Sequence, residues 1–219
     1  MVPFLTVISG LAWTIVYIES VRVGFRDKTY AIPIAALALN FGWESTYAVY
    51  DLMTSVSIQA GVNLIWALAD LAIVFTFFKF GRAEFPSLVT RSMFVAWGIL
   101  IFGVAYLVQW LFIAGFGTHD ASRYSAFLQN ALMSALFIQM AITRRGLRGQ
   151  TLNIAIAKWL GTLAPTILFG VIEGSGFILG LGIICSVFDL VYIGLVLWFQ
   201  KQLDGVTMDQ VTLTVIPMR

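Results

Sequence analysis

Long apolar runs are the feature that most restricts how this chain can fold. Hydrophobic residues make up 60% of its 219 residues and charged residues only 11%, whereas a soluble domain carries about 25% charged residues. A helix needs roughly 20 apolar residues to cross a hydrocarbon core about 30 Å thick. Seven stretches reach that length, near residues 2–21, 30–51, 60–79, 93–115, 124–143, 152–172 and 176–199. We therefore expect an all-α, multi-pass membrane protein in which residues 1–219 form a single transmembrane helical domain, with a short polar tail at 200–219.

Basic residues are distributed unevenly among the connections between these stretches. The N-terminus and the second and sixth connections carry none, and the fourth carries only Arg123. The first, third and fifth connections carry Arg22, Arg26 and Lys28, then Lys79, Arg82 and Arg91, then Arg144, Arg145 and Arg148. Because basic residues concentrate on the cytoplasmic side of a membrane, this alternation predicts a seven-transmembrane-helix bundle. Its N-terminus is expected on the extracytoplasmic or lumenal side and its C-terminus in the cytosol.

Ionisable side chains within the apolar stretches identify a candidate site. A charged residue inside a bilayer costs at least about 2.5–3.5 kcal/mol, so we expect Glu44, Asp70 and Asp189 to face the interior of the bundle. Lys158 lies about one turn from the basic side, where the long side chain can also snorkel to the interface. The sequence leaves both interpretations of Lys158 open.

Helical spacing groups polar residues with aromatic ones into stripes. Residues at i, i+4 and i+7 share one face of a helix, and a polar face is not stable against lipid. The stripes are therefore expected to converge on an interior cavity. They consist of Asn40, Glu44, Tyr47 and Asp51, of Gln59, Asn63, Trp66 and Asp70, and of Cys185, Asp189 and Tyr192.

A buried acid with aromatic neighbours suits carbocation chemistry. Desolvation disfavours the charged form of a carboxyl group, and a neutral carboxylic acid can deliver a proton to a substrate oxygen. Aromatic faces attract cations by about 0.5–2 kcal/mol, although aromatic residues also occur in every membrane bundle. The residues that flank the acids in this way are Trp43, Tyr47, Trp66, Phe188 and Tyr192.

The segment "FRDKTYAIPIAALALNFGWESTYAVYD" resembles the second-helix region of the integral-membrane terpene cyclases of fungal meroterpenoid and indole-diterpene biosynthesis, the paspaline-synthase type. Its most specific part is the pattern N-x-x-W-E-x-x-Y, at Asn40, Trp43, Glu44 and Tyr47. The segments "LIWALADLAIVFTFFKFGR", "LQNALMSALFIQMAITRRGLRGQTLNIAIAKWLGT" and "SVFDLVYIGLVLWF" are similar to later helices of the same family, in the same order.

The resemblance implies that Glu44 and Asp189 are the catalytic acids of a terpene cyclase. Substrate-binding or supporting roles are then expected for Asn40, Trp43, Tyr47, Trp66, Asp70, Phe188 and Tyr192. The implied reaction is a proton-initiated, class II-like isomerisation of secondary metabolism, with neither cofactor nor metal. A terminal epoxide or alkene of a prenylated polyketide, aromatic or indole substrate is protonated, and the rings then close through cations.

The same resemblance sets expectations about partners and location. The expected partners are the small-molecule substrate and the lipid bilayer, with no nucleic acid and no metal. Val191 stands where fungal members often carry a small residue, a departure that points to a bacterial or divergent member. The membrane is expected to be the endoplasmic reticulum in a fungus and the plasma membrane in a bacterium.

The main alternative is a small proton-coupled transporter that uses the buried carboxyls as a proton relay. Paired halves with broken helices are typical of such carriers, and the sequence has no such symmetry. A retinal protein is disfavoured because the seventh stretch contains no lysine, and a prenyltransferase because no D-x-x-x-D motif is present to hold a magnesium diphosphate.

Overall fold

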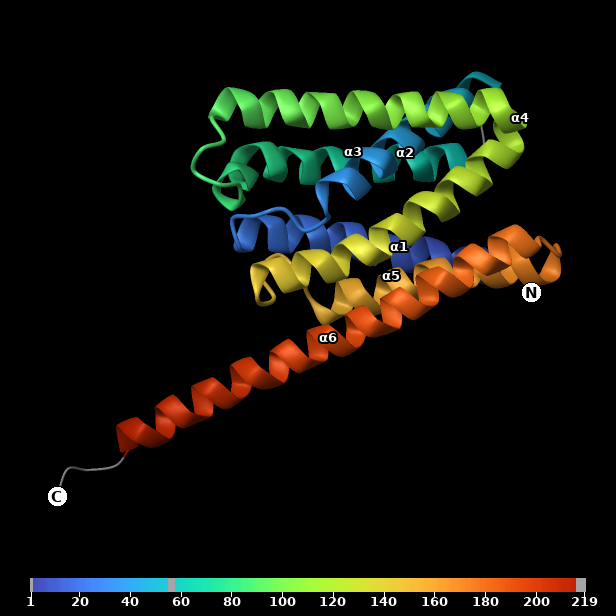
Figure 1. Ribbon diagram of the computed structural model, residues 1–219. Helices are drawn as coiled ribbons and strands as arrows, with labels where there is room; N and C mark the ends of the chain where they lie inside the picture. Colours follow the sequence, from blue (N-terminus) through green and yellow to red (C-terminus); the bar gives the residue numbers. More distant parts are fainter. Residues whose placement is uncertain (1, 55–57, 216–219) are drawn as a thin grey trace.

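The computed structural model describes residues 2–54 and 58–215, with side chains described for 2–54 and 61–203. These residues form helices and no strand, which confirms the all-α prediction. The chain order is α1 (Val2–Arg26), α2 (Ile34–Thr54), α3 (Ile58–Phe80), the 3₁₀ turn η1 (Gly81–Glu84), α4 (Arg91–Arg144), α5 (Leu152–Pro165), the π-helical segment η2 (Thr166–Ile172) and α6 (Gly176–Val215) (Figure 1).

Helix α4 is a hairpin of two helical arms. Its 54 residues would span about 80 Å if they were straight, far more than a bilayer. The helix breaks at Gly117, whose φ of 70° and ψ of 161° are not helical, and the second arm runs back beside the other helices (Figure 1). Across the hairpin the side chain of Gln109 donates to that of Gln129 at 3.3 Å. The predicted stretches 93–115 and 124–143 lie in these two arms.

Five of the described helices are long and apolar enough to cross a membrane, rather than the predicted seven. They are Val2–Arg26, Gly61–Glu84, Arg91–Arg144, Leu152–Ile172 and Gly176–Leu203. Two reasons explain the difference. The predicted spans 93–115 and 124–143 belong to the single element α4, and α2, which carries Asn40, Glu44 and Asp51, is not among the five helices.

A π-helical segment follows Pro165. Proline lacks the N–H group that continues a helical ladder, and the chain widens into η2 immediately afterwards. The i→i+5 pattern is visible where the backbone N–H of Glu173 donates to the carbonyl of Leu168 at 3.0 Å. Such segments often occur at functional sites, and η2 contributes Leu168 and Phe169 to the cavity described below.

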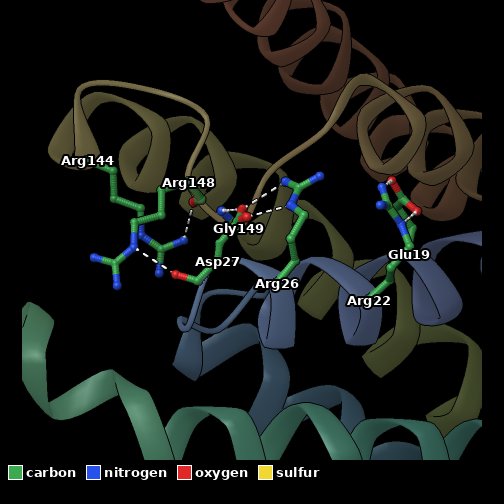
Figure 2. A network of polar contacts seen from close by, with 7 residues as sticks. All are labelled: Glu19, Arg22, Arg26, Asp27, Arg144, Arg148 and Gly149. Atoms are coloured by element: carbon green, nitrogen blue, oxygen red, sulfur yellow. Dashed lines mark hydrogen bonds and ion pairs between the residues drawn. The ribbon is translucent and has the colours of Figure 1, made fainter.

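Polar contacts hold the connections together at the basic end of the bundle, opposite the N-terminus (Figure 1). Gly149 donates its backbone N–H to the carboxylate of Asp27 at 2.7 Å, and Arg148 donates to the backbone carbonyl of Asp27 at 3.2 Å (Figure 2). Arg144 pairs with Glu84 at 2.7 Å. These bonds join residues 27–33, 81–90 and 145–151 and thereby fix the ends of the helices that carry the site.

Replacing Asp27 with asparagine should make stability less dependent on pH in the acid range. The guanidinium of Arg26 and the N–H of Gly149 hold the pKa of Asp27 below its ordinary value, which is about 3.9. A carboxyl with a lowered folded-state pKa stabilises the fold above its unfolded-state pKa, and this contribution is lost as the pH falls through the folded-state pKa. Melting in detergent should show the variant less stable than the native protein by about 1 kcal/mol at pH 7. The difference in stability between the two proteins should narrow below pH ~4. A difference in stability that does not change with pH would contradict this prediction.

Candidate active site

Three helices bring four polar side chains into one hydrogen-bonded group, which we call the acid cluster: Tyr17 of α1, Asn40 and Glu44 of α2, and Asp70 of α3. The hydroxyl of Tyr17 donates to Oε1 of Glu44. The side-chain amide of Asn40 donates to the Tyr17 hydroxyl at 2.6 Å and to Oδ2 of Asp70 at 2.9 Å, and it lies 3.1 Å from Oε1 of Glu44. The predicted stripes of α2 and α3 therefore meet at Asn40.

The acid cluster is buried, yet it leaves one oxygen of Glu44 without a partner. Glu44 is 2% exposed and Asp70 is fully buried. Oε2 of Glu44 has no hydrogen-bond partner among the described residues. A buried polar atom without a partner costs about 1–3 kcal/mol and requires an explanation. Since Glu44 also lines a cavity, a ligand in that cavity can supply the missing partner.

The cavity has a volume of about 980 Å³, and its lining residues on α1 lie between Leu5 and Tyr17, toward the N-terminal end of that helix. Ligand sites are commonly about 300–1,000 Å³ and largely apolar. Its wall is formed by α1, α2, α3, the second arm of α4, α5 and η2. The aromatic residues of that wall are Trp13, Tyr17, Trp43, Tyr47, Tyr50, Trp66, Phe127 and Phe169.

Hydrogen bonds between helices fix the aromatic wall around Glu44. The indole N–H of Trp43 donates to the carbonyl of Ser122 at 2.8 Å, which joins α2 to the second arm of α4. The indole of Trp66 donates to the hydroxyl of Thr14 at 3.2 Å, which joins α3 to α1. The Trp43 ring is 5.1 Å from the Tyr47 ring, measured between centroids. The predicted residues Asn40, Trp43, Tyr47 and Trp66 all line the cavity, together with Glu44.

Asp189 lies in a different environment. Oδ1 of its carboxylate accepts from Nζ of Lys158 at 2.7 Å, and Lys158 also donates to the hydroxyl of Ser134 at 2.6 Å. Both members of the ion pair are fully buried. The interpretation that Lys158 snorkels to the interface is therefore wrong, because its ammonium group ends against Asp189 inside the bundle.

The structure does not bring the predicted residues of the last helix to the cavity. Asp189, Tyr192 and Phe188 are absent from the described side chains that line it. Tyr192 is buried and donates to Gln150 at 3.0 Å, whereas Phe188 is 37% exposed on α6. Asp70 also lies outside the lining and reaches the cavity only through Asn40.

Sequence reasoning missed Tyr17, which is buried and bonded directly to Glu44. One signal was present, because Trp13 and Tyr17 are spaced i, i+4 in α1 and both line the cavity. Tyrosine and tryptophan are common in membrane helices, so that spacing alone does not indicate a site. In the described part of the chain, no three His, Cys, Asp or Glu side chains lie where they could hold a metal ion.

Comparison with known proteins places this geometry in a family. Residues 1–172 match the family described as Pyr4-like transmembrane terpene cyclases. The chain belongs to this family. The match confirms the resemblance found from the sequence, and it covers α1 to η2, including every residue of the acid cluster. Helix α6, with Asp189, lies beyond the matched range.

Several fungal proteins of the family are similar to this chain. It is 27% identical over 168 residues to the Pyr4-family terpene cyclase mfmH of Annulohypoxylon moriforme, covering 75% of this chain and 68% of that protein. It is 25% identical over 195 residues to the terpene cyclase pyr4 of Aspergillus fumigatus, covering 84% and 80%. It is 29% identical over 170 residues to the terpene cyclase adrI of Penicillium rubens, covering 76% and 68%. No solved structure matches the chain significantly.

Proposed function

We propose that this membrane terpene cyclase protonates the terminal epoxide of a prenylated substrate and guides cationic ring closure, with Glu44 as the proton donor. One observation carries the proposal: Oε2 of Glu44 is buried, has no partner in the described residues and belongs to a side chain that lines an aromatic cavity. An alkene in place of the epoxide would be protonated by the same group.

The acid cluster determines which oxygen of Glu44 carries the proton. Oε1 already accepts from Tyr17, and the amide of Asn40 lies within 3.1 Å of it. An oxygen that accepts hydrogen bonds is a poor position for the acid proton, so the neutral acid carries its proton on Oε2, the oxygen without a partner among the described residues. Such orientation of a donor before the substrate arrives is the usual source of efficient acid catalysis.

Besides this proton donor, the reaction needs a cavity wall that stabilises cations. Transfer of the proton from Oε2 to the epoxide oxygen breaks a C–O bond, and the carbon left behind becomes a cation. Alkene π electrons then form the ring bonds, and loss of a proton from carbon ends the sequence. Glu44, left as a carboxylate, takes up one proton in return, so the product is an isomer of the substrate. The faces of Trp43, Tyr47 and Trp66 can stabilise the cations by about 0.5–2 kcal/mol each.

Asp189 fits a supporting role better than that of a second donor. Its carboxylate is held by Lys158 and does not line the cavity. We therefore propose that it neutralises Lys158 and holds α5 against α6, which fixes the wall that α5 and η2 give to the cavity.

We also propose that the chain crosses the membrane seven times, with α2 and both arms of α4 as separate spans. The hairpin at Gly117 supports this count, since α4 is too long to cross once. The basic connections 27–33, 81–90 and 145–151 lie together at one end of the bundle, opposite the N-terminus (Figure 1). This arrangement favours a cytosolic C-terminus. The fungal relatives favour the endoplasmic reticulum as the membrane.

Incubation of the purified protein with a farnesylated aromatic epoxide, in the presence of a metal chelator, tests the proposed function. We expect a cyclic alcohol with the same mass as the substrate. Recovery of the unchanged epoxide by folded protein would contradict the proposal, and proton-driven uptake of the compound into proteoliposomes would favour a transporter instead.

A further inference from the structure

We propose that the prenyl chain of the substrate enters the cavity sideways from the lipid, through an opening between the first three turns of α1 and the start of α3. This inference rests on the proposed function, because it concerns how a substrate reaches Glu44. Two cavity-lining residues of α1 carry it. Val7 is 57% exposed and Leu11 is 63% exposed, although both line the cavity. A wall whose own side chains are exposed on a membrane-spanning helix is open toward the surrounding lipid.

The contact between α1 and α3 is tight from Thr14 toward the basic end. Trp66 donates to Thr14 at 3.2 Å, and the rings of Tyr17 and Trp66 have centroids 5.8 Å apart. Further along, a Cβ added at Gly24 would lie 3.2 Å from the side chain of Thr76. The two helices are therefore closely packed over the half that holds the acid cluster.

Nearer the N-terminus of α1, the described side chains of the same two helices leave space between them. A Cβ added at Gly10 of α1 or at Gly61 of α3 would meet no atom of the described structure within 4 Å. Gly10 and Val62 nevertheless both line the cavity. The opening is thus framed by Thr6, Gly10 and Val62, and it ends where Trp66 meets Thr14.

Packing on the other flank keeps this opening in place. Over the same turns α1 is held against α5 and η2, since Ser9 donates to the carbonyl of Gly161 at 2.8 Å and Leu5 packs with Ala164 and Leu168. A Cβ at Gly161 would lie 2.9 Å from the indole of Trp13. Helix α1 therefore cannot close on α3 without leaving α5.

The depth of the opening determines what can pass through it. Gly10 is eight residues beyond the first residue of α1, Val2, or about 12 Å at 1.5 Å per residue. In a hydrocarbon core about 30 Å thick this position faces acyl chains rather than water. A prenyl chain dissolved among those acyl chains can enter with its terminal epoxide first and reach Glu44 past Trp66. Its larger head group then remains at the opening or at the outer end of the cavity.

Bulky substitution of the framing glycine tests the opening. Gly10→Trp should fill it, and Gly103→Trp is a matched control, because Gly103 is exposed on the first arm of α4 and also has no atom within 4 Å of its Cβ position. The probe is a farnesyl chain with a photoreactive diazirine and no epoxide, in vesicles of phosphatidylcholine. Its labelling of cavity peptides needs no catalysis. We expect Gly10→Trp to slow this labelling about tenfold, and to raise the KM for the epoxide by a similar factor with kcat little changed.

Each result decides a separate point. Equal labelling rates in Gly10→Trp and Gly103→Trp would overturn the lipid opening, as would a loss of kcat without a change in KM. Labelling of the native cavity without any cyclic product would instead refute the proposed function and leave the opening standing. Melting in detergent checks folding, and Gly10→Leu replaces Gly10→Trp if the tryptophan variant does not fold.

Discussion

Replacing Glu44 with glutamine is expected to abolish cyclisation while leaving the fold intact. The side-chain amide keeps an oxygen that can accept from Tyr17, as Oε1 of Glu44 does, so the acid cluster retains its geometry. It cannot supply an acidic proton from the position of Oε2. Loss of general acid catalysis typically lowers the rate about 10²–10⁴-fold, and among the described carboxyl groups no other one both lines the cavity and has a buried oxygen without a partner.

The measurement for Glu44→Gln is the initial rate of cyclic product formation from the epoxide, with melting in detergent beside it. Asp120→Asn is the matched control, because it also converts a carboxylate to an amide but lies in an exposed pair with His119. It should cyclise at the native rate. Native activity in Glu44→Gln would remove Glu44 from the mechanism, whereas loss in both variants would indicate a general effect of charge removal.

The second large effect is expected at the buried ion pair of Lys158 and Asp189. Replacing one partner alone leaves the other charge fully buried without compensation, which costs about 3–5 kcal/mol. Replacing both with apolar residues of similar size is often neutral or stabilising. Lys158→Met and Asp189→Leu should therefore each give little folded protein, and the double variant should recover it.

Activity of that double variant separates the two roles considered for Asp189. If Asp189 holds Lys158, the refolded double variant should cyclise the epoxide at a rate within about tenfold of the native rate. If Asp189 instead donates or accepts a proton in the reaction, the double variant should be folded and inactive. The required measurements are the melting temperature in detergent and the initial rate on the same preparation.

Periodicity predicted much of the site because it reports which residues share a helix face. Asn40, Glu44 and Tyr47 were assigned to one stripe and Trp66 and Asp70 to another, and all except the half-buried Trp66 are buried in the structure. Lipid makes this signal strong, since an ionisable residue within the membrane must turn inward. The all-α fold followed from the same physics, because only helices or closed barrels satisfy the backbone in lipid.

Periodicity does not report which helices are neighbours, and the remaining predictions fell short for that reason. Lys158 was judged by its depth alone, yet its environment is set by Asp189 on the adjacent α6. Asp189 was expected to meet Glu44, but the packing of α5 against α6 turns it to Lys158. Tyr17 gave no distinct signal, because its contact with Glu44 exists only once α1 and α2 both pack against α3.

Cyclisation in water enriched in oxygen-18 tests most directly whether the epoxide is opened by proton transfer within a dry cavity. The native protein should convert the epoxide to a cyclic alcohol whose hydroxyl keeps the substrate's own oxygen, so mass spectrometry should find no label in the product. Incorporation of oxygen-18 into the product would contradict this result, because it would mean that water captures a cation in the cavity, either at the opened epoxide or after ring closure.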